Sequence, residues 1–136
     1  MATLQQAIDR IQALMGALTD MREAPDEPPE TIAVFPFAVA YAERGRWDSI
    51  SAAWAIAYHT IILEIHVSRK DLPRDIQKAM AYSESVSNAL IGDITLNGTV
   101  DTITTISYIF GPLGWNEAPS IGWRYEIGVK QKQVIS

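Results

Sequence analysis

Two histidines, His59 and His66, are the residues of this chain best suited to chemistry. They stand seven positions apart in a run that alternates like a β-strand, so we expect their side chains on opposite faces of a sheet. One metal ion could not then bind both. Glu64 and His66 share a face, yet two ligands fall short of a zinc or iron site, and a polar pair across strands is the favoured interpretation. For His59 we expect at least partial burial and a hydrogen-bond partner.

The usual catalytic signatures do not occur in the sequence. There is no cysteine and no Gly-x-Ser-x-Gly turn, and Ser83, Ser85 and Ser87 fall within a predicted helix, where solvent exposure explains them. The run 111–114 joins two predicted strands and opens no helix, so it is interpreted as a turn and not as a phosphate loop. Asn97 and Gly98 also favour a turn. We therefore expect no catalytic residue, no metal site and no cofactor.

The elements that position these residues include two predicted helices, in which apolar residues recur at intervals of three and four. The first spans residues 3–18, with Thr3 as its N-cap. The second opens at Leu72 and Pro73 and ends before Gly92, because proline suits a first turn and glycine the position after a last turn. Its expected inner face consists of Ile76, Met80, Val86 and Leu90.

Alternating or β-branched runs predict four strands, over residues 31–41, 53–67, 95–110 and 121–133. Pro36 indicates an edge or a bulge in the first strand, residues 43–47 indicate a turn, and residues 111–120 a loop. In the last strand, the inward positions hold Trp123, Tyr125, Ile127 and Val129, and charged residues point outward. The order of elements predicts one α+β domain over residues 1–136, with an antiparallel or mixed sheet of about four main strands and two helices packed on one face.

An acidic, proline-rich segment lies between the first helix and the first strand. Residues 20–30 contain five carboxylates and three prolines, which favours an exposed loop. Loops of this length are usually functional or mobile. Paired carboxylates in such a loop could not keep the fixed geometry that acid–base catalysis needs.

Four tryptophans are also informative. Trp54 and Trp123 fall in predicted strands and are interpreted as core or sheet-face residues. Trp47 and Trp115 fall in predicted loops, where a large ring is costly to leave in water. For both residues, contact with a partner protein and packing against the rest of this domain are equally favoured.

Composition limits the classes of function. The chain has 136 residues, 48% of them hydrophobic, which suits one domain with a single core. Its net charge is −5, with 16 acidic and 11 basic residues, which argues against tight binding along a nucleic-acid backbone. No apolar run approaches the ~20 residues of a membrane span, and no secretion signal is recognisable. We expect a soluble, unprocessed protein made in the cytoplasm and no membrane partner.

Several segments resemble the tail terminator (tail completion) proteins of long-tailed phages, prophages and gene-transfer particles. They are the N-terminal amphipathic helix, the strand running into LEIHVSRKDLPRDIQKAMAYSESVSNAL, a Thr/Ile-rich strand, and the closing PLGW and IGWRYEIGVKQK. The most telling residues are 112–115, 122–130 and the junction 69–73. Together these segments cover almost the whole chain.

The resemblance implies a structural protein of the virion. Such proteins form a ring, commonly a hexamer, that caps the tail tube, stops its polymerisation and presents a docking surface to the head. The implied partners are further copies of the chain, the tail tube protein and the head–tail connector or stopper protein. DNA is expected to pass through the lumen of the ring without specific binding.

Exposure and chemistry suggest which residues would meet these partners. The predicted interface residues are Arg44, Arg46, Trp47, Trp115, Asn116 and Glu117. The predicted acidic residues of the lumen are Glu23, Asp26, Glu27 and Glu30, although the same loop could equally face outward.

Two alternatives stay open. Another neck or tail component, such as a stopper or an adaptor, has the same size and class. A small oligomeric α+β domain that binds a ligand or acts as an enzyme is also compatible with these elements. A deep apolar pocket with polar groups converging near Tyr58 or His59 would favour the second alternative.

Overall fold

The computed structural model describes residues 3–19, 21–25, 35–48, 50–67, 72–115 and 118–134, with the backbone alone at 72–75, 115, 118–119 and 134. The elements follow in the order α1 (Leu4–Gly16), β1 (Phe37–Asp48), β2 (Trp54–Val67), α2 (Leu72–Ile91), β3 (Thr102–Trp115) and β4 (Ala118–Val134). The predicted α+β class is confirmed, because 27% of the structure is helical and 50% is strand.

One sheet contains all four strands, in the order β1-β2-β4-β3, and every neighbouring pair is antiparallel. β2 and β4 lie in the centre and pair along the whole length of β2, from Trp54 opposite Val134 to Val67 opposite Ile121. β1 and β3 form the two edges, and each pairing contains one register shift. The described part of the sheet therefore ends in two long edge strands.

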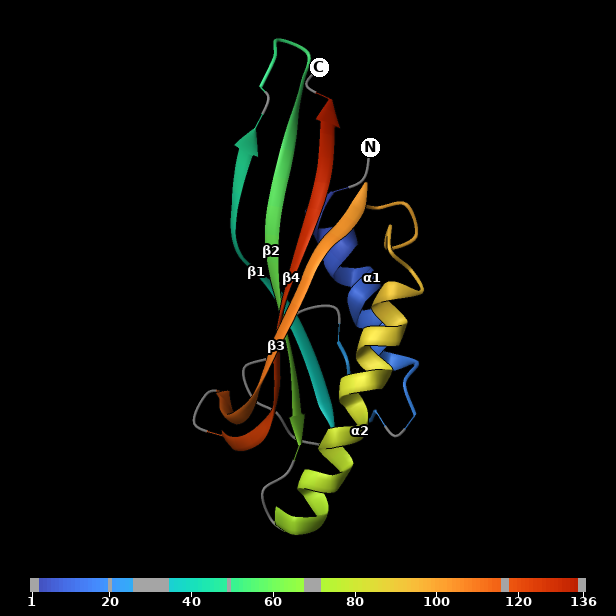
Figure 1. Ribbon diagram of the computed structural model, residues 1–136, viewed down its shortest axis with the longest axis vertical. Helices are drawn as coiled ribbons and strands as arrows, with labels where there is room; N and C mark the ends of the chain where they lie inside the picture. Colours follow the sequence, from blue (N-terminus) through green and yellow to red (C-terminus); the bar gives the residue numbers. More distant parts are fainter. Residues whose placement is uncertain are drawn as a thin grey trace.

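Both helices lie along one side of this sheet (Figure 1). α1 contacts β1 and α2, while α2 contacts β4 and β2. The face of the sheet beneath them, here called the inner face, carries the odd-numbered residues of β2 and β4 such as Leu63 and Tyr125, which are fully buried. The opposite face is called the outer face. The alternation predicted for β2 and β4 is thus confirmed, and it places His59 and His66 on opposite faces.

The helices begin and pack for local reasons. Thr3 caps α1, because its hydroxyl accepts the backbone N–H of Gln6 while the Gln6 side chain accepts that of Thr3. In α2, Val86 and Leu90 are buried as predicted. Two of its predicted inner residues, Ile76 and Met80, are instead 36% and 41% exposed. Ala79 and Tyr82 take their places in the contiguous apolar core.

Three predicted boundaries are wrong. Residues 43–47 form no turn but continue β1, with a bulge between Ala42 and Arg44. Residues 111–115 belong to β3, so the connection to β4 is much shorter than the predicted loop. The third strand begins at Thr102, because residues 92–99 form turns in which Leu96, Asn97 and Gly98 adopt positive φ angles.

The β1–β2 hairpin projects beyond the helices. In Figure 1 its tip extends well past the N-terminal end of α1, and the end of β4 accompanies it. The outer half of β1 is exposed over residues 43–48, whereas its first four residues are buried. This end of the sheet therefore presents strand surface that no helix covers.

Candidate functional site

A line of buried polar side chains crosses the outer face near the C-terminal end of β2, away from the projecting hairpin. The imidazole of His66 lies between Ser120 and Glu64, with Nδ1 2.6 Å from Ser120 Oγ and Nε2 2.8 Å from Glu64 Oε1. The Tyr41 hydroxyl donates to Glu64 Oε2 at 2.7 Å. His66 and Ser120 are fully buried, and Glu64 is 7% exposed. The four groups come from β1, β2 and β4, which the register brings side by side.

The proton positions in this line follow from the chemistry of its members. An ionised carboxylate can only accept, so His66 Nε2–H donates to Glu64, whereas the roles of Nδ1 and the Ser120 hydroxyl depend on the tautomer and charge of the imidazole. Burial and the neighbouring Glu64 carboxylate raise the pKa of Tyr41 to about 12, so this phenol remains a donor. Burial alone would raise the pKa of Glu64, but hydrogen bonds from His66 and Tyr41 outweigh it and lower the pKa.

The sequence of groups Ser120, His66 and Glu64 has the composition of a hydrolase triad. Its nitrogens are used in the opposite sense, because in serine proteases Nε2 faces the serine and Nδ1 the carboxylate. A nucleophile must also reach its substrate, and Ser120 has no exposed surface. The line is better suited to joining three strands of the sheet than to attacking a substrate. A polar pair across strands was predicted for Glu64, and its hydrogen bond with Tyr41 of β1 is such a pair. The contact of Glu64 with His66 lies instead within β2.

Sequence reasoning missed Ser120 because residue 120 was assigned to a loop. In the structure it belongs to β4, where its side chain shares the outer face with Gly122 and Arg124. The signal that could have identified Ser120 is the alternation of the last strand, continued by three residues toward the N-terminus. Within the described part of the chain, no three His, Asp or Glu side chains are grouped so that they could hold a metal ion.

The edge strand β3 carries a second candidate, an exposed apolar surface. Tyr108 on the inner face is 55% exposed and Ile109 on the outer face is 68% exposed. The Tyr108 ring lies 5.4 Å from the ring of Trp123 and 5.3 Å from that of Tyr125, which fixes it at the margin of the core. On the same inner face of β3, Ile103 is buried and Ile106 and Phe110 pack partly buried against the core, so Tyr108 is the exposed member of this row.

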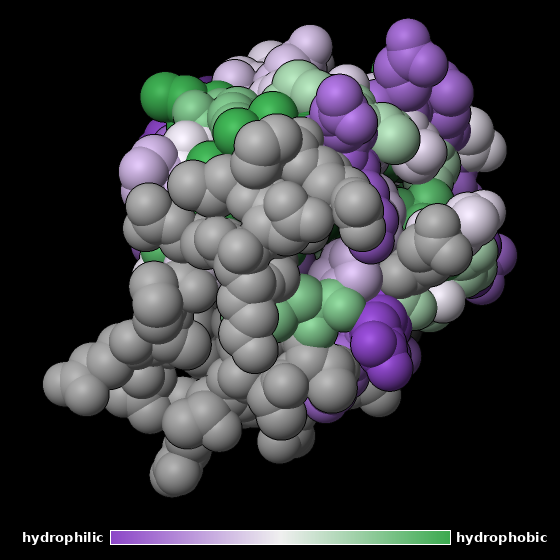
Figure 2. Space-filling model, turned by 90° about the horizontal axis from the view of Figure 1, so that it is seen from below, coloured by the Kyte–Doolittle hydropathy of each residue, from purple (hydrophilic) through white to green (hydrophobic). Residues whose placement is uncertain are grey.

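Further apolar side chains reach the surface on α2 and beyond it, at Ile76, Met80, Ile91 and Ile94. Figure 2 views the molecule from below, and there hydrophobic residues reach the surface at several places beside hydrophilic ones. Large exposed apolar surfaces are typical of contacts with other proteins. Neither Tyr108 nor Ile109 was predicted as an interface residue, because the alternation of β3 was obscured by its register shift.

The predicted interface residues of β1 are exposed, as expected. Trp47 is 48% exposed on the projecting hairpin. Arg46 pairs with Asp48 at 3.1 Å, and its guanidinium lies 4.6 Å from the centre of the Tyr58 ring. Arg44 pairs with Glu43. These residues lie in a strand and not in a turn, so their side chains alternate between the two faces of the sheet.

The remaining predicted residues are described only in part. Trp115 ends β3, and its side chain, like residues Asn116 and Glu117, lies outside the described part of the structure. The same holds for Asp26, Glu27 and Glu30. Glu23 is exposed, and its backbone forms a parallel bridge with Phe37. The structure therefore places only Glu23 of the predicted acidic group.

A hollow of about 420 Å³ lies beside Tyr58 and His59. A deep apolar pocket at this place would favour the ligand-binding alternative. The lining of the hollow is rich in charged and hydroxyl-bearing side chains, so it is not the apolar pocket that this alternative requires. Burial lowers the pKa of His59, and its Nε2 is buried without a hydrogen-bond partner among the described residues. A hydrogen bond with Gln131 acts in the opposite direction on that pKa.

Comparisons with known proteins add no family. No protein-family model matches the chain, and no curated protein matches it. Among the described residues, no helix has the length and apolar character needed to cross a membrane.

Proposed function

We propose that this chain is a structural subunit that assembles with copies of itself into a ring at the junction of a phage tail and head. The observation that carries the proposal is the edge strand β3, which exposes Tyr108 on one face and Ile109 on the other. An uncovered apolar strand at a sheet edge is a liability unless another chain covers it. The sequence resemblance to tail terminators supplies the class of assembly, commonly a hexameric ring.

The two edges of the sheet suit a head-to-tail arrangement. β3 of one copy would lie against the exposed outer half of β1 in the next, at residues 43–48. Such heterologous contacts produce a ring when the rotation between copies closes. In this role the chain needs no catalytic residue or cofactor. The ring would cap the tail tube, end its polymerisation and receive the head connector, while DNA passes through its lumen.

The test combines assembly in solution with particle morphology. We expect the purified chain, alone or on tail tubes, to form a ring whose mass by light scattering is a multiple of 15.1 kDa. Ile109→Glu should weaken assembly, because it places a carboxylate in the proposed contact. Ile91→Glu is the matched control, since Ile91 is 61% exposed at the end of α2.

Two results would contradict the proposal. One is a monomer at all concentrations together with normal tail lengths in particles that lack the protein. The other is an equal effect of the two variants on assembly. Overlong tails without the protein would favour a terminator, whereas tail-less heads beside normal free tails would favour the alternative of a stopper or adaptor.

The alternative of a small α+β enzyme would rest on the line of Ser120, His66 and Glu64, which has the composition of a hydrolase triad but not its arrangement of nitrogens. For this candidate the strand that carries Ser120 would have to move, because the hydroxyl is fully buried. A fluorophosphonate probe tests it directly. We expect no labelling of the folded protein, and labelling that disappears in Ser120→Ala would establish the hydrolase instead.

A further inference from the structure

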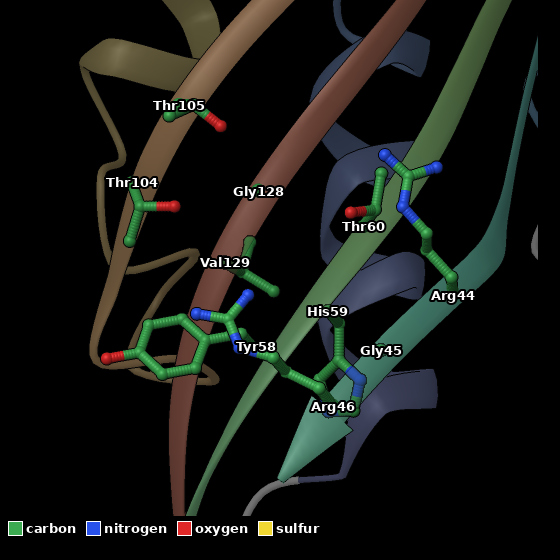
Figure 3. Close-up of a pocket in the computed structure, with 10 residues that line it drawn as sticks. All are labelled: Arg44, Gly45, Arg46, Tyr58, His59, Thr60, Thr104, Thr105, Gly128 and Val129. Atoms are coloured by element: carbon green, nitrogen blue, oxygen red, sulfur yellow. The ribbon is translucent and has the colours of Figure 1, made fainter. Parts of the chain in front are cut away.

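The hollow beside Tyr58 lies on the outer face of the sheet, at the end where the hairpin projects. One cross-strand row forms its floor, in which Arg44, Thr60, Gly128 and Thr105 stand opposite one another on β1, β2, β4 and β3. Figure 3 shows the side chains of this row, with Thr104 and Arg46, arranged around the bare backbone of Gly128. All four strands therefore contribute to one small site.

Gly128 creates the space at the centre of the hollow. A Cβ atom at this position would stand 2.6 Å from Thr105 Oγ1 and 2.9 Å from Thr104 Oγ1. Both hydroxyls thus converge on the same point above the glycine. Within the described part of the chain, the structure records no hydrogen bond for the hydroxyls of Thr60, Thr104 or Thr105. These groups are available to a ligand that enters the hollow.

The surroundings of the hollow are positively charged. Three neighbouring rows of the outer face hold four cations, Arg44, Arg46, Lys130 and Lys132, and one carboxylate, Asp48. Arg44 also pairs with Glu43 and stands 4.0 Å from Glu126 of the adjoining row, so the cations still exceed the carboxylates by one. No carboxylate of the described residues lies within ion-pair distance of either lysine. The whole chain carries a net charge of −5, so the cations are concentrated here against the average. A local field of this sign attracts anions whatever the total charge.

Arg46 and Lys132 are held in place by aromatic rings of the same face. The Arg46 guanidinium lies 4.6 Å from the centre of the Tyr58 ring, and the Lys132 ammonium 5.1 Å from that of Trp54. Cations stacked in this way keep their donors free at the edges. Arg46 also contacts Asp48, which is more than half exposed, so this ion pair contributes little and can be exchanged for a ligand.

The donors around Gly128 fit one kind of ligand best. A phosphate offers several acceptor oxygens in a tetrahedral arrangement, and guanidinium and hydroxyl groups are its common partners. We propose that this hollow binds a phosphate group, carried either by a free nucleotide or by the backbone of a nucleic acid. The proposed site contacts the phosphate and not the bases. Binding at this site would therefore be independent of sequence, which is compatible with DNA passing through a ring. The inference goes beyond the assembly role and does not depend on it.

Binding measurements on the full chain, in whatever assembly state it adopts, test the proposal. The probes are inorganic phosphate and ADP by calorimetry, and a labelled single-stranded oligonucleotide by fluorescence anisotropy, all at low salt. Arg46→Gln should weaken binding about tenfold, the value of one lost charge-assisted hydrogen bond. Arg22→Gln, an exposed arginine before β1, is the control and should change it less than twofold.

Two variants test the centre of the hollow. Gly128→Ala should abolish binding, because its Cβ would occupy the place of a ligand oxygen, whereas Gly111→Ala meets no atom within 4 Å and should bind normally. Thr105→Val keeps the shape of the side chain and removes only the hydroxyl, so it should weaken binding even if Gly128→Ala folds poorly. Circular dichroism confirms the folded state of each variant.

The outcomes separate the two sources of phosphate and the alternatives. Variant-sensitive binding of ADP or phosphate without the oligonucleotide assigns a free nucleotide, and tighter, salt-dependent binding of the oligonucleotide assigns nucleic acid. The proposal is overturned if the wild type binds none of the probes, or if Arg46→Gln and Thr105→Val bind as the wild type does. It is also overturned if poly-glutamate of equal charge competes as well as the oligonucleotide, because the surface would then accept an acidic peptide.

Discussion

Glu64 is a carboxylate held within the outer face of the sheet by donors from two sides. Tyr41 reaches one oxygen from β1, and His66 reaches the other from the same strand. These bonds outweigh the effect of burial and lower the pKa of the carboxyl. A lowered pKa in the folded state means that the ionised carboxylate stabilises the fold. This contribution is present above the unfolded pKa of about 4.3 and is lost as the pH falls through the folded pKa.

Glu64→Gln should therefore destabilise the protein in a pH-dependent way. The amide has a single acceptor oxygen, so its NH2 group would face a donor, and we expect a loss of about 1–3 kcal/mol in the free energy of unfolding at neutral pH. Below about pH 4 the wild type loses the same ionised bonds, and the two proteins should converge. Urea unfolding across this pH range measures the difference.

Glu84→Gln is the matched control, because Glu84 is exposed on α2. It should change the free energy of unfolding by less than about 0.5 kcal/mol at any pH. If the Glu64 variant were as stable as the wild type at neutral pH, or if the difference grew in acid, the assigned role of the carboxylate would be wrong.

The polar line could not be predicted from sequence, and the reason is one of register. Ser120 and His66 are 54 positions apart, and their contact depends on Ile121 pairing with Val67 and not with a neighbour. A shift by one residue would turn either side chain to the other face. Sequence reasoning did place Glu64 and His66 on one face, since that follows from alternation within a single strand.

At the scale of elements, Gly122 of β4 stands opposite His66 of β2 in the central pairing of the sheet. A Cβ atom at residue 122 would overlap the backbone carbonyl oxygen of Ile65. Glycine is needed here for close approach and not for an unusual backbone angle. The central pairing of the sheet therefore depends on a residue without a side chain.

Gly122→Ala should separate the two central strands and cost at least about 2–3 kcal/mol in the free energy of unfolding, as overpacking against backbone does. Gly111→Ala is a close control, because Gly111 pairs with Gly122 from β3 yet has open space around its Cβ position. It should cost less than about 1 kcal/mol. Thermal and urea unfolding of both variants would reveal an error if their losses were equal.

Elements with a regular pattern were predictable. α1, β2 and β4 follow their apolar periodicity, because each buries one face against the same core. The prediction failed at residues 43–47, where charges and a glycine indicated a turn. This strand projects beyond the helices, so its residues need not be apolar. Pro112 likewise favoured the predicted loop over residues 111–120, although it lies in β3. An edge strand tolerates proline when its missing N–H faces away from the partner strand.

At the scale of the whole molecule, the sheet has two edges of similar length and a helical layer on one side. Assembly through the edges predicts where protection from hydrogen exchange should increase. Amides of β3 and of residues 43–48 should exchange more slowly in the ring than in dilute monomer, because they gain partners across the contact. Amides of α1 should not change.

Hydrogen exchange with mass spectrometry at two protein concentrations measures this difference. The central strands β2 and β4 serve as internal references, because both are paired on each side in the monomer. Increased protection confined to α1 and α2 would move the contact to the helical face and would exclude the edge-to-edge arrangement.

The ring of Trp123 has a consequence for observing this protein in solution. Its indole N–H donates to the Ala79 carbonyl at 2.7 Å, and the rings of Tyr108 and Phe110 lie 5.4 Å and 5.0 Å away. Of these three described aromatic residues, Tyr108 is the one that is more than half exposed. With Trp47, Trp54 and Trp115 replaced by phenylalanine, the emission of Trp123 becomes an intrinsic optical signal for the covering of the β3 edge, without an attached label.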